Sequence, residues 1–252
     1  MTTSKPYTSV RLGVYHFFVD PFGKAALRQQ SAPSVYQQKK SLYPLPSLYM
    51  KEIHQSALEG NRHFIRRKGG SEMAGKADRE ERRNNVIEVL NKARAMELEA
   101  ISQYMNQHYN LDDMDYGELA AKIKLIAIDE MRHAERFAER IKELGGEPVA
   151  GHEGKVAKGQ PVDEIFSYDS GLEDDTIDAY NEFALVCREN GDSISMKIFE
   201  EIIDEEQIHF NHFDNVNSHI EKLGDTYLAK IAGTSSSTGL GNSGFVSSGE
   251  GE

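Results

Sequence analysis

The sequence predicts an all-α protein built as a four-helix bundle with one long connection. Three observations predict this class. Apolar residues recur at helical spacing in four long segments, the connections between these segments are short, long and short, and prolines are scarce after residue 72. Five of the seven prolines lie before that residue. The apolar stripes of the four segments are therefore expected to face one shared core.

The second and third helices have sequence signals for their ends. Gly145-Gly146 with Pro148 closes the second helix, a polar connection of residues 147–161 follows, and Gly191-Asp192 separates the third helix from the fourth. The long connection joins two helical hairpins. The predicted helices span about residues 79–109, 115–144, 162–190, 193–222 and, for a short fifth helix, 225–231.

The two ends of the chain differ from the helical part, residues 73–231. Residues 1–72 carry 11 basic and 4 acidic residues, whereas residues 73–252 carry 18 and 37, so the net charges are +7 and −19. The basic extension is expected to be disordered or not native. Codons for the residues just before Met73 can spell a ribosome-binding sequence, which would make Met73 the true start. The Ser/Gly-rich tail, residues 232–252, is also expected to be disordered.

Composition excludes several classes of function. The acidic helical part repels phosphate, so no nucleic-acid partner is expected. No apolar run reaches the length of a membrane span, so no membrane partner is expected either. A single cysteine, Cys187, rules out a disulfide framework and a Cys-based metal site within one chain. These features favour a protein of the reducing cytoplasm.

Two Glu-x-x-His motifs place carboxylates and imidazoles on the apolar stripes of the second and fourth predicted helices. The first and third helices each carry one glutamate on the same stripe. Each of these glutamates lies 33 residues before the motif of the next helix, and the two hairpins are offset by 76 residues, which indicates an internal repeat. The six candidate ligands are Glu97, Glu130, His133, Glu173, Glu206 and His209.

The chemistry of this set follows from its charge. Four carboxylates buried near one another repel, and two divalent cations would balance them. Two imidazoles complete a ligand set of oxygen and nitrogen, which suits iron or manganese, with zinc able to compete. A single Glu-x-x-His motif usually marks a solvated helix face. Two motifs and two lone glutamates at equal offsets instead predict a dinuclear metal site.

Three stretches resemble bacterioferritin, the haem-containing branch of the ferritins: ELEAISQYMNQH, IDEMRHAERFAERI and DEEQIHF. The resemblance covers about residues 73–231, and residues 1–72 have no counterpart in that family. It implies a ferritin-like bundle that stores and detoxifies iron in the cytoplasm. It also implies a hollow shell of 24 subunits, built from twofold dimers, in which Fe(II) is oxidised by oxygen or peroxide and kept as a mineral.

The resemblance also implies roles for single residues. Two iron ions per subunit are expected at a ferroxidase centre, where Tyr104 would lie close to the metals. Met131 is expected to bind one haem per subunit pair. Leu125 stands where some relatives have a histidine on the path of iron, so iron is expected to take another route. Carried over to this chain, Glu97 and His133 would hold one iron, Glu173 and His209 the other, and Glu130 and Glu206 would bridge them.

Two other functions remain open from the sequence. One is a di-metal redox enzyme of the peroxidase or catalase type, although a rubrerythrin-type peroxidase needs a Cys-x-x-Cys pair that Cys187 cannot supply. The other is a haem electron-transfer protein without storage. Assembled mass and iron content would separate both from an iron store. A ferredoxin-like donor is expected to supply electrons for iron release.

Overall fold

The chain divides into two units, Met1–Ser56 and Ala57–Glu252. In the first unit the backbone forms an antiparallel sheet with the strand order β1-β2-β3. That the extension is disordered or not native stays a prediction, and the other residues of 1–71 lie outside the described part. The strands are β1 (Ser9–Leu12), β2 (Tyr15–Val19) and β3 (Ala25–Gln29). The computed structural model describes residues 9–12, 15–19, 25–29, 72–152, 154–238 and 244–248.

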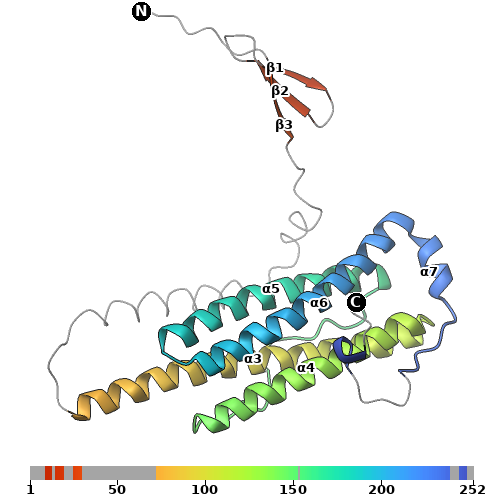
Figure 1. Ribbon diagram of the computed structural model, residues 1–252. Helices are drawn as coiled ribbons and strands as arrows, with labels where there is room; N and C mark the ends of the chain where they lie inside the picture. Colours follow the sequence, from red (N-terminus) through yellow and green to blue (C-terminus); the bar gives the residue numbers. More distant parts are fainter. Residues whose placement is uncertain are drawn as a thin grey trace, which may run out of the picture. The chain divides into compact units, whose positions relative to one another are not determined.

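The second unit is a bundle of four long helices that lie side by side, with a short fifth helix at one end (Figure 1). The predicted all-α, four-helix class and the long connection between the second and third helices are confirmed. Helix α3 packs mainly against α4, and α5 packs mainly against α6. No described helix is long and apolar enough to cross a membrane. The helices are α3 (Glu72–Asp113), α4 (Gly117–Glu143), α5 (Val162–Glu189), α6 (Ser193–Leu223) and α7 (Asp225–Ile231).

Local backbone chemistry sets the helix ends. Asp115, with a φ of 66°, forms the tight turn that separates α3 from α4. Gly145, with a φ of 79°, follows the end of α4, where its N–H donates to the carbonyl of Lys142. Asp192 begins α6 by accepting hydrogen bonds from two backbone N–H groups, and Arg140 of α4 donates two more to its carboxylate. These contacts fix the register of α4 against α6.

Helix α3 begins at Glu72 rather than near residue 79 as predicted. Its first turns contain alanine, lysine, arginine and glutamate, which form helix readily without burying an apolar stripe. Periodicity therefore gave no signal for them. The long connection runs along the same helix: Asn91 exchanges hydrogen bonds with the backbone of residues 147 and 149, and Gln103 exchanges two with Ala157.

Two aromatic layers close the core on either side of a polar centre. In one layer the ring of Phe199 lies 5.1 Å from Phe137 and 5.4 Å from Tyr180, measured between ring centroids. In the other, the ring of Phe213 lies 5.4 Å from Tyr104. All five side chains are almost wholly buried. The hydroxyls of the two tyrosines point away from their layers toward the candidate metal ligands.

The C-terminal tail departs from the expectation of disorder. Residues 244–248 pack against α4, and Val246–Ser248 form a 3-10 turn, η1. The ring of Phe245 is 1% exposed, and its N–H donates to the carbonyl of Leu125 over 3.1 Å. The prediction was wrong for these five residues because one buried aromatic ring offsets the Ser/Gly-rich composition around it. Residues 239–243 and 249–252 lie outside the described part.

Candidate metal centre

The structure brings all six predicted ligands together, and each is buried. Helices α3 and α5 supply the outer glutamates, Glu97 and Glu173, while α4 and α6 supply the central glutamates, Glu130 and Glu206. The six residues form two overlapping sets, within each of which the candidate ligand atoms lie less than 4.8 Å apart. Both sets contain the central glutamates. The first set is Glu97, Glu130, His133 and Glu206, and the second is Glu130, Glu173, Glu206 and His209.

Both imidazoles turn their Nδ1 atoms toward the central glutamates. His133 Nδ1 lies 2.9 Å from Glu130 Oε2 and 3.1 Å from Glu206 Oε1. His209 Nδ1 lies 3.1 Å from Glu206 Oε2 and 3.2 Å from Glu130 Oε1. The two ring centroids are 6.0 Å apart. The central glutamates therefore sit between the two histidines, as bridging ligands of two metal ions would.

Each outer glutamate is held by a tyrosine from the other helical hairpin. Tyr104 on α3 donates from its hydroxyl to Glu173, and Tyr180 on α5 donates to Glu97, both over 2.5 Å. These paired contacts follow the internal repeat of the sequence. They show that Tyr104 contacts a candidate ligand of α5 rather than one of its own helix. The tyrosines fix the carboxylate rotamers and shield them from water.

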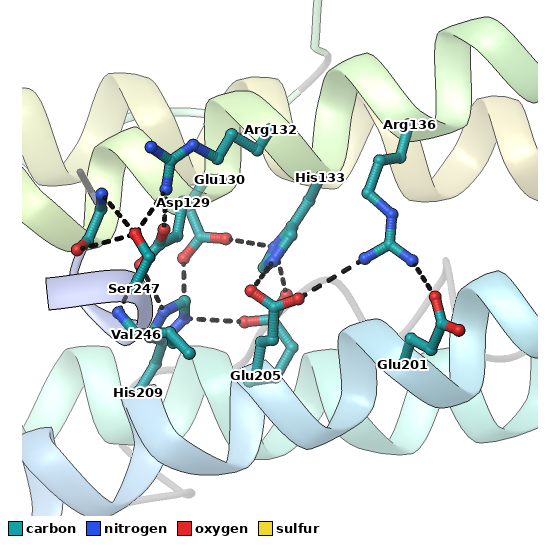
Figure 2. Close-up of polar contacts among 12 residues, drawn as sticks. Asp129, Glu130, Arg132, His133, Arg136, Glu201, Glu205, His209, Val246 and Ser247 are labelled. Carbon is teal, nitrogen blue, oxygen red and sulfur yellow. Dashed lines mark hydrogen bonds and ion pairs between the residues drawn. The ribbon is translucent and has the colours of Figure 1, made fainter. Parts of the chain in front are cut away.

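A second pair of acids faces the outer nitrogens of the histidines. His133 Nε2 lies 3.3 Å from Glu205 Oε2, and His209 Nε2 lies 3.5 Å from Asp129 Oδ2 (Figure 2). Each of these acids directly precedes the glutamate of one Glu-x-x-His motif and reaches across to the histidine of the other. A carboxylate on the outer nitrogen orients an imidazole and makes the inner nitrogen a better metal ligand.

Burial and mutual charge shift the protonation of the centre. Burial raises the pKa of both outer glutamates well above its ordinary value, and the charges of the central glutamates raise it further. Burial alone would lower the pKa of His133 and His209, but the facing carboxylates outweigh it and hold both pKa values well above the usual range. Burial would also raise the pKa of Glu206, yet the charge of His133 keeps it below the ordinary value.

The centre also holds buried oxygen atoms without hydrogen bonds. Among the described residues, Oε1 of Glu130 and Oε1 of Glu206 are both buried and form no hydrogen bond, although each lies close to an imidazole nitrogen. A buried acceptor without a hydrogen bond costs about 1–3 kcal/mol. Both atoms belong to the residues that the two ligand sets share. The donor set thus fits two metal ions, which would satisfy these oxygens.

Met131 lies apart from the centre. Its side chain is 47% exposed, although Glu130 beside it is buried, because successive helical residues point about 100° apart. The resemblance implies that four apolar residues line a haem pocket together with Met131, and all four are partly buried: Leu98, Ile101, Met105 and Ile128. Leu125 is buried in the core, and its carbonyl accepts from the tail.

Sequence reasoning missed three partners of the centre. Glu205 and Asp129 lie beside the ligands in sequence and look like ordinary flanking charges, and Val246 lies in the tail. The repeat contained a signal for the two acids, since an acidic residue precedes both Glu-x-x-His motifs. No comparable signal marks Val246, whose N–H reaches Asp129 across 117 residues of sequence.

Comparisons with known proteins agree with this architecture. The family described as Ferritin, Ferritin-like domain, matches residues 87–223. Bacterioferritin from Desulfovibrio desulfuricans is 66% identical over 174 residues, which cover 69% of this chain and 96% of that protein. Bacterioferritin BfrA from Mycobacterium tuberculosis is 33% identical over 141 residues, which cover 56% and 89% of the two chains.

Solved structures that are similar to this chain are also bacterioferritins. The X-ray structure of Desulfovibrio desulfuricans bacterioferritin, described with its diiron site in different catalytic states, has a TM-score of 0.64 at 67% identity and covers 65% of this chain and 95% of that chain. The structure of Mycobacterium tuberculosis BfrA has a TM-score of 0.56 at 32% identity, covering 58% and 93%. The sequence resemblance is thereby confirmed, and the chain belongs to the bacterioferritins, within the ferritin-like family.

Proposed function

We propose that this chain is a subunit of an iron store that oxidises Fe(II) to Fe(III) at a di-iron ferroxidase centre. The observation that carries the proposal is the pair of overlapping buried ligand sets that share Glu130 and Glu206. Their composition of carboxylates and imidazoles suits iron, and the family relationship supports the same metal. Storage as a mineral inside a shell of 24 subunits is part of the proposal.

Each residue has a distinct role in this proposal. Glu97 and His133 would hold one iron, Glu173 and His209 would hold the second, and the central glutamates would bridge them. The outer glutamates and the histidines, whose pKa values are raised, release protons as the cations bind. Tyr104 and Tyr180 keep the outer carboxylates in place during this exchange.

Fe(II) is the substrate, and the bound ions supply the electrons of the reaction. With dioxygen as the oxidant, two Fe(II) ions lose one electron each, and dioxygen gains both electrons and two protons to give hydrogen peroxide. With peroxide as the oxidant, the same two electrons and two protons give water. The side chains of this centre bring two cations close together and neutralise their charge.

Subunit assembly is the second part of the proposed function. Twofold dimers of this chain would build the closed shell, and the acidic residues of the helical part would attract Fe(II) toward it. The relatives named bacterioferritin support such an assembly.

Iron loading tests oxidation and storage together. About two Fe(II) ions per subunit are added without oxygen, oxygen is then admitted, and further Fe(II) follows while absorbance and particle mass are recorded. We expect rapid formation of Fe(III) and a soluble mineral that elutes with a particle far heavier than a dimer. Oxidation without soluble mineral would instead indicate a di-metal redox enzyme. Without oxidation, the proposed function fails.

Met131 is proposed as the ligand of a haem shared by two subunits. Its exposed thioether on the outer face of α4, next to partly buried apolar residues, fits a group that needs the same side chain from a second copy. Two thioether ligands favour ferrous haem, which would pass electrons inward for iron release. A ferredoxin-like protein is the proposed donor.

We expect Met131→Leu to abolish haem binding while the bundle and its metal centre are retained. Leucine has a similar volume but no sulfur, so the change removes the ligand with little effect on packing. Haem absorbance per subunit after reconstitution measures the outcome. Met196→Leu, a partly buried methionine of α6, is the matched control and should keep the haem. Equal haem content in both variants would rule out Met131 as the ligand.

A further inference from the structure

The C-terminal strap, which we define as residues 244–248, contacts Asp129, the acid that faces one histidine of the centre. The N–H of Val246 donates to Asp129 Oδ2 over 2.9 Å, and the same oxygen lies 3.5 Å from His209 Nε2 (Figure 2). Arg132 donates to the other oxygen of Asp129 over 2.9 Å. Both oxygens of the carboxylate are thus held, and Oδ2 also faces the histidine.

The strap packs closely against the side chains around Asp129 and His209. The ring of Phe245 lies 4.7 Å from the ring of His212 and 6.3 Å from that of His209, between centroids. A Cβ atom at Gly244 would lie only 1.6 Å from Asp129 Oδ1, so the backbone approaches the carboxylate as closely as a glycine allows. Ser247 closes the turn by accepting from Gly244 and from Arg132.

In the other half of the centre, the acid that faces the histidine is more exposed to solvent. Glu205 faces His133 as Asp129 faces His209, but the side chain of Glu205 is 32% exposed, whereas that of Asp129 is 2% exposed. Among the described residues, the carboxylate of Glu205 accepts a hydrogen bond from Arg136 and faces His133, but it accepts none from a backbone N–H group. The internal repeat therefore supplies both acids, and the strap distinguishes one side of the centre from the other.

We propose that the C-terminal strap is a positioning element of the metal centre: it fixes Asp129 so that this carboxylate orients His209. It acts on only one of the two ligand sets, the one that contains Glu173 and His209. Loss of such an outer partner typically weakens metal binding about 10–100-fold. The inference rests on the proposed metal centre, but its test does not depend on iron oxidation.

The test compares Val246→Pro with Val246→Ala. Proline removes the N–H that reaches Asp129 and is tolerated at the first position of a helical turn, whereas alanine keeps the N–H. Co(II) is titrated into the metal-free full chain, and its absorption spectrum reports the two sites. We expect Val246→Pro to lower the Co(II) affinity of one site about 10-fold relative to Val246→Ala and to leave the other unchanged.

A His209→Ala background shows whether the effect passes through this histidine. The difference between the proline and alanine variants should vanish there, because coupled residues are not additive. Two further variants serve if the proline variant fails to fold. Phe245→Ala should lower the Co(II) affinity of the same site, and Phe245→Leu should keep most of that affinity.

The outcomes separate the two proposals. Equal affinities in the native background, or a difference that persists without His209, would overturn the role of the strap while the metal centre stands. A native chain that binds no Co(II) at these residues would overturn the proposed function instead.

Discussion

The Glu130→Ala variant is expected to oxidise Fe(II) at least about 100-fold more slowly than the native chain, because loss of even an outer partner costs about 10–100-fold in metal affinity or activity. Glu130 belongs to both ligand sets, and its carboxylate lies 2.9 Å from His133 and 3.2 Å from His209. Alanine therefore removes a ligand from both metals. The affinity for the second ion should fall most, since only one central glutamate remains to balance two cations.

Fast mixing of the metal-free protein with Fe(II) and oxygen measures this effect, and a Co(II) titration counts the remaining sites. Glu135→Ala is the matched control, since Glu135 is an exposed glutamate of the same helix. Glu130→Gln keeps the shape of the side chain and removes its charge, which separates coordination from packing. Equal oxidation rates in the native and Glu130→Ala chains would show that the buried carboxylates serve another purpose.

The sequence was sufficient to predict the six residues that gather in the centre. The pattern was readable because a carboxylate on an apolar stripe is rare, and the offset of 76 residues repeats the pattern in each hairpin. The helical period then places Glu97 and Glu173 opposite the two Glu-x-x-His motifs, and the structure brings all of them together. Their role as metal ligands stays a prediction until metal binding is measured.

The surroundings of the centre were not predictable in the same way. Asp129 and Glu205 lie about 100° around their helices from the neighbouring ligands, so the periodicity alone assigns them to the flanks. Their partners come from the opposite helix and are visible only in three dimensions. Phe245 lies in a Ser/Gly-rich segment whose composition favours disorder, and its binding surface exists only once α4 and α6 have packed together.

Metal ions are expected to stabilise the bundle, and to do so more strongly as the pH rises. The pKa values of Glu97, Glu173, His133 and His209 are raised in the folded metal-free chain. A group with a raised pKa contributes stability below its unfolded pKa and loses it as the pH rises through the folded value. The metal-free bundle should therefore lose stability from mildly acidic pH upward.

Glu206 affects the stability of the metal-free bundle in the opposite direction, but only at a pH below the mildly acidic range. Its pKa is lowered, so its contribution is present above the ordinary carboxyl value of 4.5 and is lost only in stronger acid. Metal binding replaces the protons held by the other groups, so affinity rises with pH. At a metal concentration about 100 times the Kd, each site adds about 2.7 kcal/mol, and two sites add about 5 kcal/mol to the free energy of unfolding.

Denaturant unfolding with Co(II) and with a chelator, at about pH 5.5 and about pH 8, checks this expectation, since ordinary histidine titrates between these two values and ordinary carboxyl groups titrate below the lower one. The chelated protein should unfold more easily at the higher pH, and the gain from Co(II) should be larger there. In Glu130→Ala most of that gain should disappear, because both ligand sets lose the shared carboxylate. A gain that is the same at both pH values would mean that the centre does not exchange protons for metal, and the buried carboxylates would then need a different counter-charge.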